Sequence, residues 1–392
     1  MRKIFFDHIS TTPTDPRVVE EMLPYFTSQF GNPSSLFYEH GQQAAKALEE
    51  ARAKVAGLIG AEAQNIIFTS GATEANNMAI KGIAWANEDK GRHIILSDIE
   101  HFSVLFAAQA LSRWGFEITR VPVDSYGIID LGALKASIRA DTILISIMHA
   151  NNEIGTIEPI VEIANIAREK GILFHADAVG TVGIIPVNVG ELGVDALTLA
   201  SHSFYGPKGI GALYLKQGIR IDPLLQGGFQ EAGYRSGTEN LPGAVGLGVV
   251  AQIAKEEMPS RIEHLLILRD LLWRGLSQRI QDIHFTGHPT QRLPGHVSFW
   301  VENAEGESLL LHLAFKGIEL ASGSACSSNI RGRTEEDLAA SQVLTAIGVP
   351  SHICTGSLTI SLGKDNNREE VEYFLEVFPG IVERLRAMSP WK

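Results

Sequence analysis

The sequence predicts an α/β protein with a doubly wound, mostly parallel sheet in a large domain and a smaller α+β domain toward the C-terminal end. Between residues 64 and 215, short apolar runs alternate with longer amphipathic stretches, as in a parallel sheet whose strands are connected by helices. The apolar runs are continuous, which is typical of strands covered on both faces. The expected strands are residues 65–70, 93–97, 142–147, 172–175 and 196–200.

Helical spacing fills the gaps between these strands, and the pattern changes after about residue 251. The helices expected in the first part are residues 72–87, 103–114 and 160–170. In the second part we expect a long amphipathic helix at 262–280, strands at 296–300 and 357–361, and a closing helix at 368–386. These lengths and periods are typical of an α+β arrangement.

The length of 392 residues suffices for two domains of usual size. We expect a large domain of residues 15–255 and a small domain made of residues 1–14 plus 256–392. In a sheet of the predicted kind, ligands bind at the carboxyl ends of the strands.

The composition is that of an ordinary globular protein, with 45% hydrophobic and 20% charged residues and a net charge of -12. A negative protein gains no long-range attraction to nucleic acid or an acidic membrane surface. No apolar run approaches the ~20 residues that span a bilayer, and the apolar run near Met1 is too short for a signal peptide. We therefore expect a cytoplasmic protein without nucleic-acid or membrane partners.

A candidate phosphate site lies at residues 69–76, Thr-Ser-Gly-Ala-Thr-Glu-Ala-Asn, which follow a buried strand and open a helix. Gly71 permits a tight turn, and the free N–H groups of the helix start, with the Thr73 hydroxyl, can hold a phosphate. The alternative is an ordinary strand–helix turn in which Ser or Thr caps the helix. This segment alone leaves both interpretations open.

Further polar side chains follow other predicted strands. Asp177 ends a strongly apolar strand, where a carboxylate must be paired or solvated. A protonated ring nitrogen of a bound heterocycle would be a suitable partner, and a salt bridge or helix cap is the alternative. His101 follows the strand at 93–97, and a hydroxyl-rich turn, residues 201–209, follows the strand at 196–200. A packed or capped histidine and a loop with a hydroxyl cap are the alternatives at these two places. Because strand ends share one edge of the sheet, these groups predict a pocket.

The chain has two cysteines, Cys326 and Cys354, too few for a disulfide framework. Cys326 lies among small polar residues beside a stretch, 327–340, that has no apolar period and is expected to be a mobile loop. Exposure favours thiol reactivity, so Cys326 is the candidate nucleophile. Cys354 is expected to be passive and partly buried.

Taken together, these segments resemble the cysteine desulfurases of iron–sulfur cluster assembly, within the class V aminotransferase group. The resemblance covers nearly the whole chain. Its motifs are GNPSS (31–35), SGATEANN (70–77), EH (100–101), ANNEIGT (150–156), DAV (177–179), YGPKG (205–209), RSGTEN (235–240) and GSAC (323–326).

The resemblance implies a pyridoxal-phosphate transferase of the aspartate-aminotransferase-like fold, a homodimer with the cofactor near the subunit boundary. His101 would stack on the pyridine ring and Asp177 would pair with its nitrogen, which keeps the ring an electron sink. Asn152 would touch the ring hydroxyl or the substrate. The phosphate would be held by Ala72, Thr73, Ser201 or His202, and Thr238 of the neighbouring subunit.

The same resemblance implies that Cys326 takes sulfur from L-cysteine. Its thiolate would carry the sulfur as a persulfide to an iron–sulfur scaffold protein.

Three positions depart from the family pattern. Ser203 stands where the family has the lysine that holds the cofactor, and it has no amine with which to bond the aldehyde. Gly180 replaces a glutamine that donates to the ring oxygen. Thr359 replaces an arginine that would grip the substrate carboxylate bidentately. Lys208 belongs to the ordinary pattern and does not compensate.

Two hypotheses follow from these departures. In the first, the protein is a desulfurase-type enzyme that binds pyridoxal phosphate noncovalently, with His202 and Ser203 lining the gap, and its activity is weak or altered. In the second, it is a sulfide or persulfide relay, or it supplies Cys326 as a ligand to a transient iron–sulfur cluster on a scaffold protein, since thiolates suit such clusters.

Overall fold

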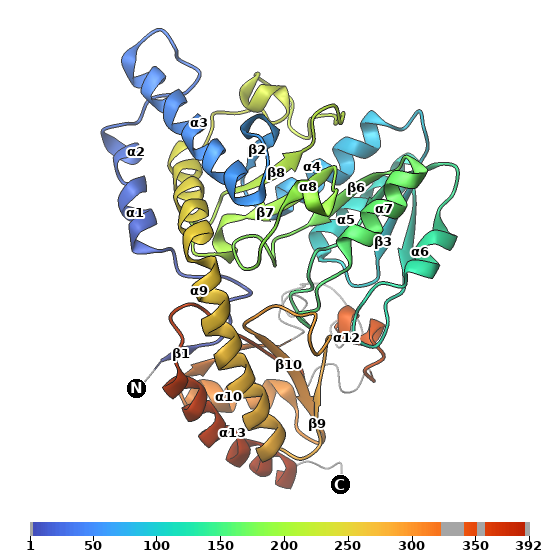
Figure 1. The fold of residues 1–392 in the computed structure, drawn as a ribbon, viewed down its shortest axis with the longest axis vertical. Coiled ribbons are helices and arrows are strands. Elements are labelled where there is room, and N and C mark those ends of the chain that lie inside the picture. The colour runs from blue at the N-terminus through green and yellow to red at the C-terminus, as the bar shows by residue number, and fades with distance from the viewer. Residues whose placement is uncertain (1–2, 323–340, 351–356, 389–392) are drawn as a thin grey trace.

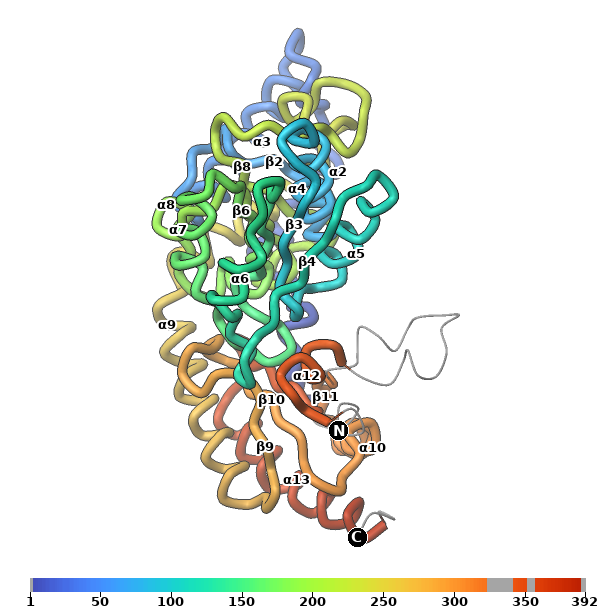
Figure 2. The backbone as a smooth tube through the Cα atoms, turned by 90° about the vertical axis from the view of Figure 1, so that its right-hand side faces the viewer, coloured from blue at the N-terminus to red at the C-terminus, as the bar shows by residue number. Residues whose placement is uncertain are grey.

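The computed structural model of the chain describes residues 3–322, 341–350 and 357–388. Two bodies lie one above the other along the long axis of the molecule (Figure 1), and helix α9 (Leu241–Arg279) runs along one side of both. Figure 2 shows the same stacking from the side, with the sheet of the upper body seen near one edge.

The upper body contains a seven-stranded sheet in the order β2-β8-β7-β6-β5-β3-β4. Strand β8 is antiparallel to both neighbours, and the other pairs are parallel. The predicted α/β fold with a mostly parallel sheet is therefore confirmed. The strands are β2 (Ile66–Thr69), β3 (His93–Ser97), β4 (Glu117–Val121), β5 (Thr142–Ser146), β6 (Leu173–Asp177), β7 (Ala196–Ala200) and β8 (Gly211–Leu215).

Helices cover both faces of this sheet, as the continuous apolar runs predicted. Strand β3 places Ile94 and Leu96 in one apolar core and Ile95 in another on the opposite face. Helices α4 (Ala72–Ala86) and α5 (Phe102–Ala110) contribute to the first core. The second is covered by α3 (Glu39–Ile59), α7 (Ile160–Lys170) and the first half of α9. Shorter helices are α1 (Pro16–Met22), α2 (Pro24–Thr27), α6 (Leu131–Ser137) and α8 (Val189–Leu192).

The predicted helix at 262–280 is too short at its start. Helix α9 begins at Leu241 and continues through Pro259. The Asn240 side chain caps its start by accepting from the Gly243 N–H at 3.1 Å. The first half of α9 was not predicted because it contains several glycines, and glycine is a poor helix former. Here they allow close packing: a Cβ on Gly248 would lie 2.7 Å from the Ala51 Cα of α3.

The lower body packs helices on an antiparallel sheet in the order β12-β13-β10-β9. The two strands predicted here pair directly, with His296 opposite Ser361, and Phe6 of the N-terminal segment packs into the same core. Its strands are β9 (Ile283–Phe285), β10 (His296–Val301), β12 (Ala321–Ser322) and β13 (Ser357–Ser361), beside the pair β1 (Ile4–Phe5) and β11 (Ile318–Glu319). Its helices are α10 (Gly306–Phe315), α12 (Gln342–Ala346) and α13 (Arg368–Met388).

Two strands of the large sheet, β4 and β8, were missed by sequence reasoning. Strand β4 lies at the sheet edge, and its residues before Val121 are partly or fully exposed. The loop expected at 327–340 lies outside the described residues. No helix in the described part of the chain is both long and apolar enough to cross a membrane.

Candidate active site

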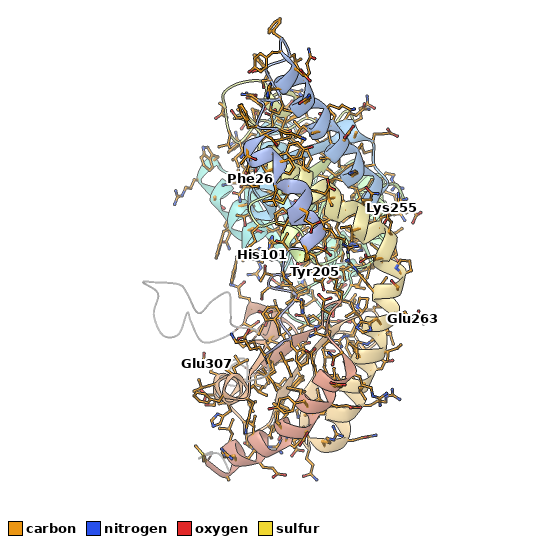
Figure 3. All side chains as sticks on the ribbon, turned by 90° about the vertical axis from the view of Figure 1, so that its left-hand side faces the viewer. Phe26, His101, Tyr205, Lys255, Glu263 and Glu307 are labelled. Carbon is orange, nitrogen blue, oxygen red and sulfur yellow. The ribbon has the colours of Figure 1, made fainter. Side chains whose placement is uncertain are left out.

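Four segments that carry the predicted polar residues meet at one edge of the large sheet. Asp177 is the last residue of β6, and a short turn, Ser201–Ser203, follows β7. His101 follows β3 and caps α5, and β2 leads into α4 through Gly71. Figure 3 shows His101 and Tyr205 at mid-height, close to the level where the two bodies meet.

A chain of hydrogen bonds connects three of these segments. The His101 Nδ1 atom lies 2.7 Å from the Ser103 Oγ atom, and Nδ1 also accepts from the Ser103 N–H at 3.1 Å. The Asn76 Nδ2 group lies 2.8 Å from the Ser103 Oγ atom and donates to Asp177 Oδ2 at 2.7 Å. The order His101, Ser103, Asn76, Asp177 therefore holds the imidazole and the carboxylate in a defined relation.

Asp177 is buried, at 5% exposure, and its described partners are all neutral. Besides Asn76, the Val179 N–H donates to its Oδ1 at 3.0 Å. No lysine or arginine within the described ranges forms an ion pair with it. A buried carboxylate with neutral donors has room for a cationic N–H donor, so the predicted pairing with a protonated ring nitrogen fits this site.

The start of α4 has the features of an anion cradle. Gly71 has a φ of +152°, no side chain caps the first turn, and nothing lies within 4 Å of where its Cβ would be. The alternative interpretation, a Ser or Thr cap, is therefore not what the structure shows. Thr73 is exposed on the first turn, and the buried Ser201 Oγ has no hydrogen-bond partner. Free N–H groups at a helix start suit a phosphate.

Ser203 cannot supply an amine, and its side chain is engaged elsewhere. It is 6% exposed, and its Oγ donates to the Ala200 carbonyl at 2.8 Å. Ser203 also lines a cavity of about 60 Å³ between the two bodies, the interdomain cavity. The cavity's lysine, Lys364, is bound to Asp15 at 2.5 Å, and Lys208 is exposed. His202, which precedes Ser203, is half-buried, and burial lowers the pKa of its imidazole.

Gly180 and Thr359 border the same loop, residues 150–156. A Cβ on Gly180 would lie 3.3 Å from the Ala150 carbonyl oxygen, and the Thr359 Oγ1 donates to the Glu153 carbonyl at 3.1 Å. Asn152, in this loop, is half-buried, and its carbonyl lies 3.0 Å from His296 Nε2. Two of the three departures from the family pattern are thus truncations around one loop.

Thr238 is exposed on the loop before α9. Arg235 of this loop pairs with Glu74 of α4 at 2.7 Å. Near the loop's start, buried Glu231 pairs with Arg52 at 2.6 Å. The Arg235–Glu74 pair holds the loop against α4, and the Glu231–Arg52 pair holds it against α3. The role of Thr238 in a neighbouring subunit stays a prediction.

Cys326 and Cys354 lie outside the described residues, as does the predicted cluster ligation. The described chain reaches Ser322 of β12, where the preceding residue, Ala321, is paired with Thr359 of β13. Cys326 comes four positions after Ser322 in the sequence. The described residues contain no group of three or more His, Cys, Asp and Glu side chains that could hold a metal ion.

Sequence reasoning missed Asn76 and Ser103, which belong to this network, and Glu100, which lies near Asp177. Asn76 and Glu100 lie in motifs that the sequence made visible, but only the tertiary structure shows their contacts. Glu100 is 6% exposed, and its Oε1 accepts from Ser97 Oγ at 2.6 Å and the Met148 N–H at 2.9 Å. Its Oε2 is buried without a partner. Burial raises the pKa of Glu100 to about 8, with a contribution from nearby Asp177.

This pKa makes folding stability depend on pH. The folded state binds the Glu100 proton more tightly than the unfolded state, so its stabilising contribution is complete below about pH 4.5 and is lost as pH rises toward about 8. Between these two pH values the free energy of unfolding falls by ~1.4 kcal/mol per pH unit. We expect Glu100→Gln to match wild type in urea unfolding at pH 5 and to exceed its stability by ~2–4 kcal/mol at pH 8. Exposed Glu62→Gln is the control; parallel curves for wild type and Glu100→Gln would contradict the assignment.

With this geometry established, the comparisons with known proteins identify the class. The family model for class-V aminotransferases matches residues 4–374. The chain belongs to that family.

Within it, the chain is 50% identical to the cysteine desulfurase IscS of Dictyoglomus turgidum, with 100% of this chain and 97% of that protein covered. It is 52% identical to the cysteine desulfurase IscS of Methanosarcina thermophila, over 99% of this chain and 94% of that one. The solved structure of a NifS-like protein superposes with a TM-score of 0.90 at 38% identity, over 98% of this chain and 100% of that chain. The chain is therefore a member of the cysteine desulfurase group, and the resemblance inferred from its motifs is confirmed.

Proposed function

We propose that this protein is a pyridoxal-phosphate-dependent sulfurtransferase of the cysteine desulfurase type that serves iron–sulfur cluster biogenesis, holds its cofactor noncovalently and turns over slowly. The observation that carries the proposal is the hydrogen-bonded network from His101 to Asp177 beside an uncapped helix start, with Ser203 at the position of the covalent tether.

The described residues fit the cofactor without a covalent bond. The α4 N–H groups at Ala72 and Thr73, with the unpartnered Ser201 Oγ, would hold the phosphate. Asp177 would pair with the ring nitrogen, and the His101 ring, fixed by Ser103, would lie against the ring face. Pyridoxal phosphate supplies an electron sink for reactions at the α-carbon of an amino acid.

Cys326 would receive the sulfur. Its thiolate attacks the sulfur of L-cysteine, the S–S bond forms as the Cβ–S bond breaks, and Cβ gains a proton to give alanine. The products are alanine and a Cys326 persulfide, which passes sulfur to an iron–sulfur scaffold protein. The anchoring of β12 beside Thr359 supports this role because it brings the chain to the site four residues before Cys326.

Slow turnover follows from what residues 203 and 359 lack. A positioned acid–base group typically contributes 10²–10⁴ in rate, and Ser203 offers no amine for that task. A bidentate arginine–carboxylate contact contributes about 1.5–3 kcal/mol, and the Thr359 hydroxyl is bound to a backbone carbonyl.

The lack of an amine at Ser203 and of a guanidinium at Thr359 also favours a second candidate function. The protein would act as a sulfide or persulfide relay, or as a partner whose Cys326 ligates a cluster on the scaffold. This function needs the fold and Cys326 but no turnover of cysteine.

Exposed aromatic side chains support the proposal of a homodimer. Phe37 is 100% exposed and Phe229 is 92% exposed, and Phe229 lines a hollow of about 620 Å³ together with Leu36. Large apolar surfaces of this kind mark interaction sites. We also propose the division into residues 15–255, and 1–14 plus 256–392, and a cytoplasmic location.

A direct assay separates the two functions. The purified protein is mixed with pyridoxal phosphate, its visible spectrum is recorded, and alanine and sulfide are measured after addition of cysteine. Slow, cofactor-dependent alanine formation supports the enzyme. A protein that forms no alanine but still binds an iron–sulfur scaffold through Cys326 would establish the relay instead.

Removing the Asp177 charge should weaken cofactor binding. We expect Asp177→Asn to lower the noncovalent affinity for pyridoxal phosphate by ~10- to 100-fold, since hydrogen bonds to charged groups contribute about 1.5–3 kcal/mol. Equilibrium dialysis measures this affinity. The surface change Asp141→Asn, next to Arg139, is the matched control. Equal affinities in the two variants would show that Asp177 does not contact the ring.

A further inference from the structure

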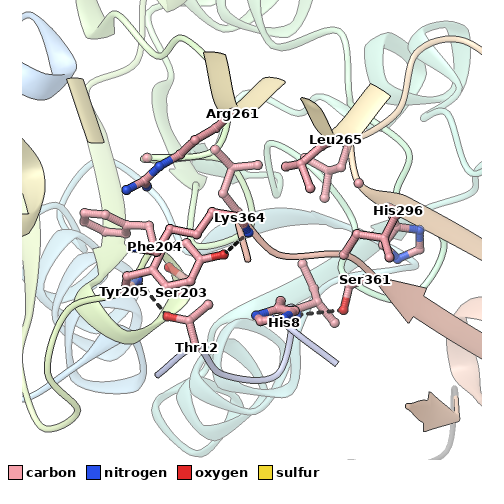
Figure 4. A pocket seen from close by; sticks show the side chains of 16 residues that line it. His8, Thr12, Ser203, Phe204, Tyr205, Arg261, Leu265, His296, Ser361 and Lys364 are labelled. Atoms are coloured by element: carbon pink, nitrogen blue, oxygen red, sulfur yellow. Dashed lines mark hydrogen bonds between the residues drawn. The ribbon is translucent and has the colours of Figure 1, made fainter. Parts of the chain in front are cut away.

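The interdomain cavity is lined by an arginine that has a buried nitrogen without a hydrogen-bond partner. Arg261 of α9 is 9% exposed, and its Nε and Nη2 both donate to Glu257 Oε2, at 3.1 and 2.6 Å. Its Nη1 is buried and makes no hydrogen bond. Figure 4 shows Arg261 among the side chains that surround the cavity, opposite His8. Because an unpartnered buried charged donor is costly, this nitrogen indicates a ligand.

The hydroxyl groups that line the cavity already have partners. The Thr12 Oγ1 donates to the His202 carbonyl at 2.8 Å and accepts from the Tyr205 N–H at 2.6 Å. The Ser361 Oγ accepts from the Ile9 N–H at 2.8 Å. Among the lining side chains of the described chain, Arg261 Nη1, His8 Nδ1 and His296 Nδ1 are buried without a partner.

The two histidines that line the cavity do not replace the Arg261 guanidinium as the cationic group. Burial lowers the pKa of the His8 imidazole, which disfavours its charged form. The His296 Nδ1 faces Gly155, where a Cβ would lie 2.5 Å away, and burial also lowers the His296 pKa. Arg261 is therefore the charged donor that is left.

The ion pairs around the cavity show which carboxylates the nearby cations bind. Lys364 binds Asp15, Arg17 binds both Asp15 and Glu257, and Arg261 binds Glu257.

Tyr205 holds the two cations of the cavity in place. Its φ is +76°, and its ring lies 5.1 Å from the Arg261 guanidinium carbon and 4.8 Å from Lys364 Nζ. Its hydroxyl accepts from the Lys364 N–H at 2.6 Å. Such cation–π contacts orient a guanidinium without occupying its N–H groups, so Nη1 stays available.

The cavity size selects a small ligand. Its volume is about 60 Å³, and one water molecule needs roughly 10–15 Å³ by this kind of measure. Room for a handful of non-hydrogen atoms suits alanine or cysteine. Ile9, Ile184 and Leu265 supply an apolar wall for a short side chain.

We propose that the interdomain cavity binds the carboxylate of a small amino acid, with Arg261 Nη1 as its donor. The identity of that amino acid as cysteine rests on the proposed function. Thr359 offers no carboxylate clamp, and Arg261 supplies one from a different element, in a cavity that Ser203 also lines. Arg261 is then a specificity-determining residue.

Calorimetric titration of the full-length protein tests this proposal. The probes are L-alanine, which carries no sulfur, and ethylamine, which lacks only the carboxylate. We expect alanine to bind at least tenfold more tightly than ethylamine, and Arg261→Met to weaken alanine binding at least tenfold. Arg17→Met, which removes the other partner of Glu257, should leave alanine binding within twofold of wild type.

A second variant guards against misfolding. Arg261→Lys keeps the charge and should retain part of the alanine affinity; if Arg261→Met does not fold, this variant and the two wild-type titrations decide. Absence of alanine binding to wild type, equal binding of both probes, or unchanged binding in Arg261→Met would each overturn the proposal. Persulfide formation at Cys326 is measured in parallel. A persulfide without Arg261-dependent binding sinks this inference alone, and Arg261-dependent binding without a persulfide sinks only the proposed function.

Discussion

Ser203→Lys is expected to bind pyridoxal phosphate covalently and to raise the rate of alanine formation from cysteine by ~10²–10⁴-fold, the contribution of a positioned acid–base group. Residue 203 lies in the short turn after β7, at the same sheet edge as Asp177 at the end of β6. Borohydride reduction followed by mass spectrometry reports the bond independently of activity. The rate gain will stay below that of a complete site while Thr359 remains.

The control for this change is Ser203→Met, which adds comparable length without an amine. It should bind the cofactor no more tightly than wild type and give no borohydride-stable adduct. A stable adduct on a lysine of the wild-type protein would contradict the proposal that the cofactor is held by its phosphate and ring alone.

Cys326→Ser is expected to reduce sulfur transfer to a scaffold protein to background. A hydroxyl forms neither a persulfide nor a good cluster ligand, so the result holds for the enzyme and the relay alike. Alkylation and mass spectrometry after incubation with ³⁵S-labelled cysteine detect the persulfide. Cofactor binding should be unchanged, since the cofactor-binding residues proposed here lie elsewhere in the chain.

Cys354→Ser is the matched control, because it removes the other thiol of the chain. It should transfer sulfur at the wild-type rate. If cluster assembly survives Cys326→Ser and fails in Cys354→Ser, the two cysteines exchange roles.

The edge of the sheet was predictable because each polar motif follows an apolar run. Local hydrophobic periodicity predicts strands and helices, and the carboxyl ends of parallel strands meet at one edge of the sheet. The sequence therefore predicts that Asp177, His101 and Thr73 lie at the same edge. Helix α9 was predicted only in its second half, because its first half contains glycines, which are poor helix formers, and one of them, Gly248, packs closely on Ala51 of α3.

The contacts within the edge could not be predicted in the same way. Asn76 and Asp177 are 101 residues apart in sequence, and their 2.7 Å hydrogen bond depends on how α4 packs across the sheet. The burial of Glu100 and the free Nη1 of Arg261 likewise arise from residues distant in the chain. No local pattern encodes such pairs.

By itself, the sequence determined the fold class, the family and the lack of an amine at residue 203, because these depend on residue type and local order. Tertiary structure alone decided which groups are buried, which are partnered and which are left free, because those properties arise when segments far apart in sequence exclude water from one another. The network at Asp177 and the interdomain cavity at Arg261 belong to this second kind.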